Sequence, residues 1–424
     1  MIKKITNKTI SKISKLIPLT KKRPKLRSIT DINLIGKTVL IRVDFNVPTI
    51  KKGNRLIIKD NEKIKASLIT IKYFLRNDCK IILMTHFGRP KGRNLKLLRT
   101  NLVAKELRKL LPKNRIIKVD DCLGQEVKDK IEKAKNKEII LLENLRFYDE
   151  EIQNDYSFAH SLANLADIYI NDAFAVSHRE HASVCAITKF IPAYMGLLLE
   201  TELLNLNKAF RPQRPSVWIM GGSKLNKINL IESAIKNADK ILIGGALAFP
   251  FLKAKGYNVG HSLCDQNSVK IATKIIKNNK RYKNKIVLPI DFICSKRIAK
   301  NSKAISKDFN NIESDEIGLD IGPKTVQLFN FHILNARTII WNGPLGYFEI
   351  KKFQKGSQEI ANSIAKSQSF SIIGGGESSE MIEMFKLKKK ISHISTGGGA
   401  SITYLSNKKL PAIKALLDNF KLFN

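Results

Sequence analysis

Short apolar runs rich in β-branched residues alternate along this chain with longer amphipathic segments, and this alternation constrains the fold most strongly. Helix-like segments such as 101–111 and 227–238 lie between the runs. Continuous apolar strands separated by helices are typical of parallel sheets covered on both faces. The pattern therefore predicts an α/β fold. The predicted strands are 39–43, 81–84, 139–142, 168–170, 217–220, 241–243, 286–288, 338–341 and 371–373.

Nine strands of this kind are too many for one compact sheet in a chain of 424 residues. A helix-like stretch over 196–210, followed by the letters RPQRP, divides the strands into two groups. We therefore predict two doubly wound domains with mainly parallel sheets, joined by that helix.

The chain carries 75 Lys and Arg against 37 Asp and Glu, a formal charge of +38. Such an excess is compatible with nucleic-acid binding. The alternative is a general enrichment of Lys at tolerant surface positions, which we favour because no helix-turn-helix signature or aromatic-and-basic strip is present. We expect no nucleic-acid partner.

Residues 1–27 hold ten basic residues and no acidic one. The segment could be an organellar transit peptide or a disordered extension, and we favour the extension. No apolar run reaches the ~18–20 residues that span a bilayer, so we expect no membrane segment. Five scattered Cys indicate reduced thiols and no zinc site. We expect a cytoplasmic protein, with organellar targeting by residues 1–27 as the alternative.

Charged residues follow four predicted strands of the first half. Arg42 lies at the end of the first of these strands, and Arg89, Arg146 and Arg179 follow the other three, with several His nearby. Ligands of open α/β sheets bind at the carboxyl ends of the strands, and Arg binds phosphate and carboxylate with two parallel hydrogen bonds. A ring of Arg at one sheet edge predicts a site for a small, multiply charged anion.

Glycine follows the strands of the second half instead, in clusters such as 221–222, 244–245, 374–376 and 397–399. Gly-rich turns that open helices present bare N–H groups to phosphate. Neither GxxxxGK[ST] nor GxGxxG occurs. Together the halves predict phosphoryl transfer between a small anion and a polyphosphate, with closure of the domains to exclude water.

The motifs resemble those of the phosphoglycerate kinase family, in order and in spacing, from about residue 28 to the C-terminus. The matching strings are RVDFNVP (42–48), HFGRPKG (86–92), LENLRF (142–147), NDAF (171–174), HREHAS (178–183), GLDIGPKT (318–325), WNGPLGYFE (341–349), GGGES (374–378) and STGGGAS (395–401).

The resemblance implies two Rossmann-like domains with a hinge, and reversible transfer of a phosphoryl group between 1,3-bisphosphoglycerate and ADP, giving 3-phosphoglycerate and ATP in glycolysis. It implies Mg²⁺, carried as MgATP or MgADP, and a monomer. Residues 28–195 with 405–424 would form the phosphoglycerate-binding domain, 196–210 the interdomain helix, and 211–404 the nucleotide-binding domain. No general base is needed, because the acceptor is already a carboxylate.

The resemblance also implies individual site residues. Glu349 would hold the ribose, Gly245 would lie against the adenine, and Glu377 would bind Mg²⁺. Residues implied to bind phosphoglycerate are Asp44, Asn46, Lys63, His86, Arg89, Arg146, His178 and Arg179. Residues implied to bind the nucleotide are Gly222, Lys224, Lys227, Gly245, Asn342, Pro344, Gly346, Glu349, Gly374, Gly375, Gly376, Glu377 and Ser378. Residues implied in the transfer are Arg42, Lys63, Lys224, Lys227, Gly375 and Gly398.

Three positions depart from the family pattern. Lys63 stands where the family has Arg, which loses the planar fork. The Lys224–Lys227 spacing is one residue short, and Glu377 replaces Asp, which moves the carboxylate by roughly 1–1.5 Å. The alternative to an active kinase is therefore a catalytically impaired homologue that acts as a nucleotide-binding protein.

Overall fold

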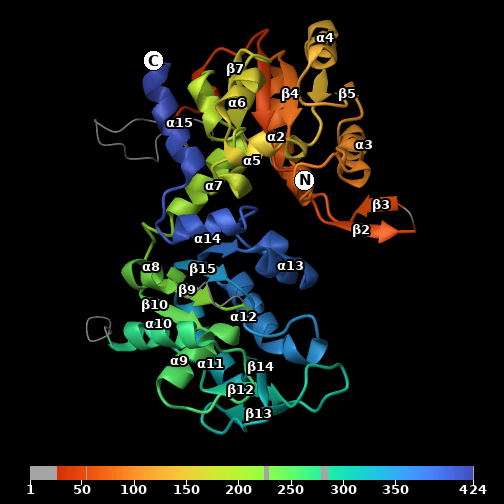
Figure 1. The fold of residues 1–424 in the computed structure, drawn as a ribbon. Helices are drawn as coiled ribbons and strands as arrows, with labels where there is room; N and C mark the ends of the chain where they lie inside the picture. Colours follow the sequence, from red (N-terminus) through yellow and green to blue (C-terminus); the bar gives the residue numbers. More distant parts are fainter. Residues whose placement is uncertain (1–25, 54, 224–228, 278–284, 424) are drawn as a thin grey trace. The chain divides into compact units, whose positions relative to one another are not determined.

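The computed structural model describes residues 26–53, 55–223, 229–277 and 285–423, and these form two compact units (Figure 1). Unit 1 comprises the described parts of Met1–Asp172 with Arg179–Leu197 and Pro411–Asn424. Unit 2 comprises those of Ala173–His178 and Leu198–Leu410. Each of the nine predicted runs contains a strand, and the α/β prediction is confirmed.

The sheet of unit 1 has six parallel strands in the order β5-β6-β4-β1-β7-β8. After β1 the chain forms β4, β5 and β6 on one side of that strand, with β6 inserted between β4 and β5, and then crosses to the other side at β7. Such a reversal leaves a crevice at the carboxyl ends of the central strands. The strands are β1 (Thr38–Arg42), β4 (Lys80–Met84), β5 (Ile116–Lys118), β6 (Ile139–Leu141), β7 (Ile168–Asn171) and β8 (Ala193–Met195).

Helices cover this sheet because its strands are apolar on both faces. Alternate residues such as Val39 and Ile81 pack with Ile71 and Leu107 in one buried cluster. Side chains of the opposite parity, such as Tyr169, are buried as well. The helices of unit 1 are α2 (Glu62–Arg76), α3 (Asn101–Leu110), α4 (Gln125–Lys133), α5 (Asp149–Gln153), α6 (Tyr156–Ala163) and α15 (Pro411–Leu422).

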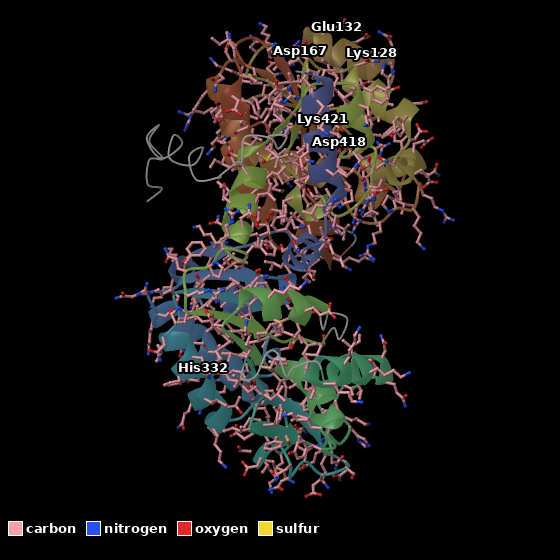
Figure 2. The ribbon with its side chains drawn as sticks, turned by 90° about the vertical axis from the view of Figure 1, so that its left-hand side faces the viewer. Lys128, Glu132, Asp167, His332, Asp418 and Lys421 are labelled. Carbon is pink, nitrogen blue, oxygen red and sulfur yellow. The ribbon has the colours of Figure 1, made fainter. Side chains whose placement is uncertain are left out.

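The amino ends of these strands lie at the edge opposite to the crevice. The Asp167 carboxylate accepts a hydrogen bond from the Thr38 N–H at 2.8 Å, where β1 begins. Figure 2 shows Asp167 at the same end of unit 1 as Lys128 and Glu132 of α4. The labelled charges at this end are therefore remote from the residues that follow the strands.

Unit 2 has a second sheet of six parallel strands, in the order β11-β10-β9-β15-β16-β17. The chain adds β10 and β11 on one side of β9 and then adds β15, β16 and β17 on its other side. The crevice of this sheet therefore lies beyond the ends of β9 and β15, at Met220 and Asn342. The strands are β9 (Ser216–Met220), β10 (Lys240–Ile243), β11 (Ile286–Val287), β15 (Thr338–Asn342), β16 (Phe370–Gly374) and β17 (His393–Ile394).

A buried cluster that includes Val217, Trp341, Phe329 and Ile360 joins one face of the second sheet to its helices. A small antiparallel sheet, ordered β13-β12-β14, follows β11 and was absent from the sequence prediction. Its strands are β12 (Asp291–Ser295), β13 (Ile305–Asp308) and β14 (Ile317–Ile321). The helices are α7 (Leu197–Asn207), α8 (Asn229–Asn237), α9 (Ala248–Ala254), α10 (Gln266–Lys277), α11 (Pro323–Leu334), α12 (Lys355–Lys366), α13 (Gly376–Met384) and α14 (Gly399–Leu405).

A two-stranded antiparallel hairpin, β2 (Thr49–Lys52) and β3 (Arg55–Ile58), connects β1 to α2. The last helix, α15, packs on β8 and on the short helix η5 (Ala186–Lys189) of unit 1. Among the described residues, no helix is long and apolar enough to cross a membrane.

Candidate active site

Residues that follow the strands of unit 1 form a cluster of cations around one carboxylate. Arg42 ends β1, and Asp44 follows it by two residues. His86 follows β4, and Arg146 lies in η3 (Leu145–Phe147) after β6. We call the group consisting of Arg42, Lys63, His86, Arg89, Arg146 and Arg179 the basic cluster.

Asp44 is the acceptor at the centre of the basic cluster. Lys63 Nζ donates to Asp44 Oδ2 at 2.7 Å, and Asn46 N–H donates to Asp44 Oδ1 at 3.1 Å. Asn46 in turn accepts the Gly88 N–H at 2.9 Å on its side-chain oxygen. The motifs after β1 and β4 are therefore tied together, and Lys63 is held beside them from α2.

His86 is buried and neutral. Burial, followed by the charges of Arg42, Arg146, Lys63 and Arg179, holds the pKa of His86 well below its usual range. Arg42 Nη2 lies 3.2 Å from His86 Nδ1. A guanidinium can only donate, so Nδ1 accepts and the imidazole carries its proton on Nε2. His86 therefore contributes a hydrogen-bond donor to the cluster rather than a charge.

Arg146 and Arg179 are held close to other cations. Burial, Arg179 and Arg42 lower the pKa of Arg146 to about 10, and Arg146 Nη1 donates to the Gly88 carbonyl at 2.8 Å. Burial and Arg89 lower the pKa of Arg179 as well. Cations that lower one another's pKa favour an anion between them. This part of the molecule therefore suits a small ligand with several negative charges.

Arg42 differs from the other cations because it has no accessible surface. Its Nε donates to Ser183 Oγ at 2.8 Å, and Nη1 donates to the Val43 carbonyl. A side chain buried in this way supports its neighbours rather than touching a ligand directly. The predicted role of Arg42 in the transfer stays a prediction.

His178, predicted to share the patch with Arg179, belongs to the segment Ala173–His178 of unit 2. A Cβ built on Gly399 would lie 3.5 Å from His178 Nε2, so this His lies against the amino end of α14. Its participation in the basic cluster stays a prediction.

The glycine turns of unit 2 interlock at the crevice of the second sheet. Gly221 N–H donates to the Asn342 carbonyl at 2.9 Å, and Gly222 N–H donates to the Pro344 carbonyl at 2.7 Å. A Cβ on Gly343 would lie 2.0 Å from the Gly221 carbonyl oxygen, and Gly343 has φ +91°. Only glycine permits the turns after β9 and β15 to approach this closely.

A cavity of about 370 Å³ opens beside these turns. Phe249 and Phe292, whose ring centroids lie 5.1 Å apart, form an apolar wall, while Glu349 and Glu377 bring carboxylates to the lining. A slot with apolar walls and bare glycine backbone suits a planar base followed by phosphates. Six predicted nucleotide residues line it: Gly222, Gly245, Pro344, Gly346, Glu349 and Glu377.

The remaining predicted nucleotide residues that the structure describes lie next to this lining. Asn342 Nδ2 donates to the Gly374 carbonyl at 2.9 Å, and Ser378 Oγ accepts the Gly343 N–H at 2.7 Å. Gly375 has φ +99° and precedes α13, whose first turn holds Gly376 and Glu377. The first turn of a helix favours an anion, because its N–H groups and the helix dipole point toward its amino end.

The donor set of unit 2 fits Mg²⁺ only when phosphate supplies most of its ligands. Among the residues that the structure describes, no group of three or more His, Cys, Asp and Glu could hold a metal ion. Glu377 supplies one hard oxygen in the cavity lining. Mg²⁺ binds in this way through one or two carboxylates and the substrate phosphates.

Gly398, predicted to act in the transfer, has φ +50° and precedes α14. The turn before it is held from α7, because the buried Glu202 accepts hydrogen bonds from Thr396 N–H at 2.7 Å and from Thr396 Oγ1 at 2.8 Å. Lys224 and Lys227 lie outside the described residues.

Sequence reasoning missed three kinds of site residue. The apolar walls Phe249 and Phe292 lie far apart in the chain and carry no motif of their own. Asp320 lines the cavity, although only its string GLDIGPKT attracted notice. Buried polar residues such as Asn144 and Glu151, which hydrogen-bond to the site residues or their neighbours, were not predicted, because their partners are known only from the fold.

A family model described as phosphoglycerate kinase matches residues 29–408. Phosphoglycerate kinase of Dictyoglomus turgidum is 45% identical over 391 residues, covering 92% of this chain and 97% of that protein. The Thermosipho africanus protein of the same name is 44% identical over 403 residues, covering 94% and 99%.

The fold has a close counterpart among solved structures. The structure of phosphoglycerate kinase from Coxiella burnetii superposes with a TM-score of 0.83 at 35% identity. The match covers 93% of this chain and 99% of that one.

Proposed function

The chain belongs to the phosphoglycerate kinase family, the glycolytic phosphotransferases, and we propose that unit 1 binds 3-phosphoglycerate or 1,3-bisphosphoglycerate while unit 2 binds ATP or ADP. The family uses MgATP. The observation that carries the assignment of unit 1 is the group of mutually repelling Arg side chains around Asp44, which an anionic substrate would relieve.

In unit 1, Arg89, Arg146 and Arg179 are the proposed ligands of the substrate's phosphate and carboxylate groups. Asp44 and Asn46 supply acceptors for its hydroxyl group, and His86 donates from Nε2. Lys63 is the proposed cation beside the transferred group. Its 2.7 Å contact with Asp44 would then be exchanged for a contact with substrate. Arg42 is proposed to orient His86 without touching the substrate.

In unit 2, the cavity beside the glycine turns is proposed to hold the nucleotide. Its aromatic wall suits the base, Glu349 the ribose hydroxyls, and the first turn of α13 the phosphates. Bound Mg²⁺ would neutralise phosphate charge, and Glu377 is its proposed protein ligand. Lys224 and Lys227 keep their proposed roles near the phosphates from the sequence alone.

The chemistry requires positioning and charge stabilisation rather than a general base. The 3-phosphoglycerate carboxylate attacks the γ-phosphorus, its oxygen forms the new bond to phosphorus, and ADP leaves with the electron pair. The cations stabilise charge on the transferring group, and closure of the two units is proposed to exclude water. A monomer acting in the cytoplasm is proposed with this activity, and the role of residues 1–27 stays open.

A coupled assay on the purified chain tests this proposal. ADP formation should depend on ATP, on 3-phosphoglycerate and on Mg²⁺, and a chelator should abolish it. Calorimetry with each substrate added alone measures its affinity in the absence of turnover. Tight nucleotide binding with no turnover at saturating substrates would overturn the proposed activity in favour of an impaired homologue that binds nucleotide.

A further inference from the structure

Glu151 is a buried carboxylate that the proposed mechanism does not use. It lies in α5 and has no accessible surface. Burial by itself raises the pKa of a carboxyl group, but His181, Arg42 and Ser183 together hold the pKa of Glu151 below its usual value. Glu151 is therefore ionised, and its partners all belong to the surroundings of the basic cluster.

The first set of partners is the segment 181–183, which begins two residues after Arg179. Ser183 N–H donates to Glu151 Oε2 at 2.9 Å, and Ser183 Oγ donates to Oε1 at 2.7 Å. The Ala182 N–H donates to the Glu151 backbone carbonyl at 2.9 Å, and His181 Nδ1 lies 3.6 Å from Oε1. One residue of α5 thus binds Ala182 and Ser183 of the loop that carries Arg179, and it lies beside His181.

The second partner is Arg42. Its Nη2 lies 3.8 Å from Glu151 Oε1, and its Nε donates to the same Ser183 Oγ that Glu151 accepts from. Arg42 Nη2 then donates to His86 Nδ1 at 3.2 Å. A continuous path of buried polar contacts therefore runs from Glu151 through Arg42 to His86.

We propose that Glu151 is a positioning residue of the phosphoglycerate site, which fixes the loop carrying Arg179 and, through Arg42, the orientation and hydrogen-bond polarity of His86. This inference rests on the proposed function of unit 1. Without the Glu151 carboxylate, the buried Arg42 would lose the ion pair at 3.8 Å, and the two donors of Ser183 would lose their acceptors. Such networks hold their geometry only when every member is satisfied.

The decisive variant is Glu151→Gln, which keeps the shape but removes the charge and replaces one acceptor with a donor. We expect the KM for 3-phosphoglycerate to rise about tenfold, with kcat and the KM for ATP changed less than about twofold. Calorimetry should show the same loss in affinity. Glu151→Asp, which keeps the charge, should recover part of it.

Glu150 provides a matched control, because it lies on the same helix but is exposed. Glu150→Gln changes the net charge equally and should leave both KM values unchanged. If Glu151→Gln fails to fold, Ser183→Ala gives an independent test. This variant keeps the charges of Arg42 and Glu151 but removes the hydroxyl group between them. It should raise the KM for 3-phosphoglycerate as well.

An active wild type whose folded Glu151→Gln and Ser183→Ala variants keep the KM for 3-phosphoglycerate would overturn the positioning role. A lower KM would overturn it too, because Glu151 would then act only as an opposing charge. A wild type that neither binds nor turns over 3-phosphoglycerate would overturn the proposed function together with the inference.

Discussion

Individual cations of the basic cluster have different roles because their burial differs. Arg42 is fully enclosed and donates to protein acceptors, whereas Arg89 is exposed and Arg179 is half-buried. His86 resembles a cation in sequence but is held neutral by burial and by its Arg neighbours. At the residue scale, the environment rather than the residue type determines which side chains can meet a substrate.

Lys63 gives the first prediction at this scale. Its ammonium pairs with Asp44 at 2.7 Å and is about one-third exposed. An Arg at this position could contact Asp44 and a phosphoryl oxygen simultaneously with its planar fork. Lys63→Arg is expected to raise kcat by about tenfold in the coupled assay. Lys65→Arg on the exposed face of α2 is the control, and an unchanged kcat in Lys63→Arg would contradict the prediction.

Asp320 gives a prediction about pH. Burial raises its pKa to about 8, although the N–H groups of Gly356, Ile321 and Ser357 oppose the rise. In the unfolded chain an Asp titrates near 3.9. Between these values the folded state retains a proton that the unfolded state has lost. The contribution of Asp320 to the free energy of unfolding is therefore complete below about pH 4 and is lost as the pH rises through 8.

Asp320→Asn places a side chain of similar shape at this position that stays uncharged at every pH. Relative to this variant, the free energy of unfolding of the wild type should fall by about 2–4 kcal/mol between about pH 5 and pH 9. Tryptophan fluorescence during urea unfolding measures this free energy for unit 2. Asp320 lies in that unit, and so do both tryptophans of the chain, Trp218 and Trp341. Parallel pH profiles for the two proteins would refute the assignment.

At the element scale, α15 supports unit 1 through one buried amide. Asn419 accepts the Ala193 N–H at 2.8 Å and a donor of Arg27. It donates to the carbonyls of Thr188 and Ile191. Four groups from distant parts of unit 1 thus depend on one side chain of its last helix.

Asn419→Ala should destabilise unit 1 by about 2–4 kcal/mol, because it leaves buried polar groups without partners. Far-UV circular dichroism in urea should show an earlier transition, while the tryptophan transition of unit 2 stays in place. Lys421→Ala, at an exposed position of the same helix, should move neither. An equal shift of both transitions in Asn419→Ala would contradict a role confined to unit 1.

The whole molecule carries a formal charge of +38, of which the basic cluster accounts for only a small part. The remaining cations create a field that attracts anionic substrates over distances of about a Debye length, ~10 Å at 0.1 M salt. This interpretation favours steering of small anions over binding of nucleic acid.

Raising NaCl from about 20 to 300 mM should therefore increase the KM for 3-phosphoglycerate several-fold with little change in kcat. Sucrose at equal osmolarity is the control. A KM independent of salt would show that the surface charge does not contribute. A steeply salt-dependent, tight complex with DNA would favour the nucleic-acid alternative instead.

Apolar periodicity predicted the two parallel sheets, and the motif positions placed the candidate site residues after the strands, where the carboxyl edges lie. This was possible because strand burial leaves continuous apolar runs, and because parallel strands bring the residues that follow them to one edge. Motifs such as RVDFNVP and HFGRPKG then carried the family resemblance. The antiparallel sheet was not predicted, because its strands, such as Ile305–Asp308, are short and partly polar.

Which charges are enclosed, and which groups balance them, depends on the packing of the folded chain. Nothing in the chain order relates Glu151 to Arg42 or Ser183, and the aromatic wall of Phe249 and Phe292 forms across separate elements. Burial and pairing depend on the whole packed environment, whereas periodicity is a local property of the chain. Accordingly the fold could be predicted from the sequence and candidate site residues could be named from it, whereas the protonation of His86 and the enclosure of Arg42 could not be predicted.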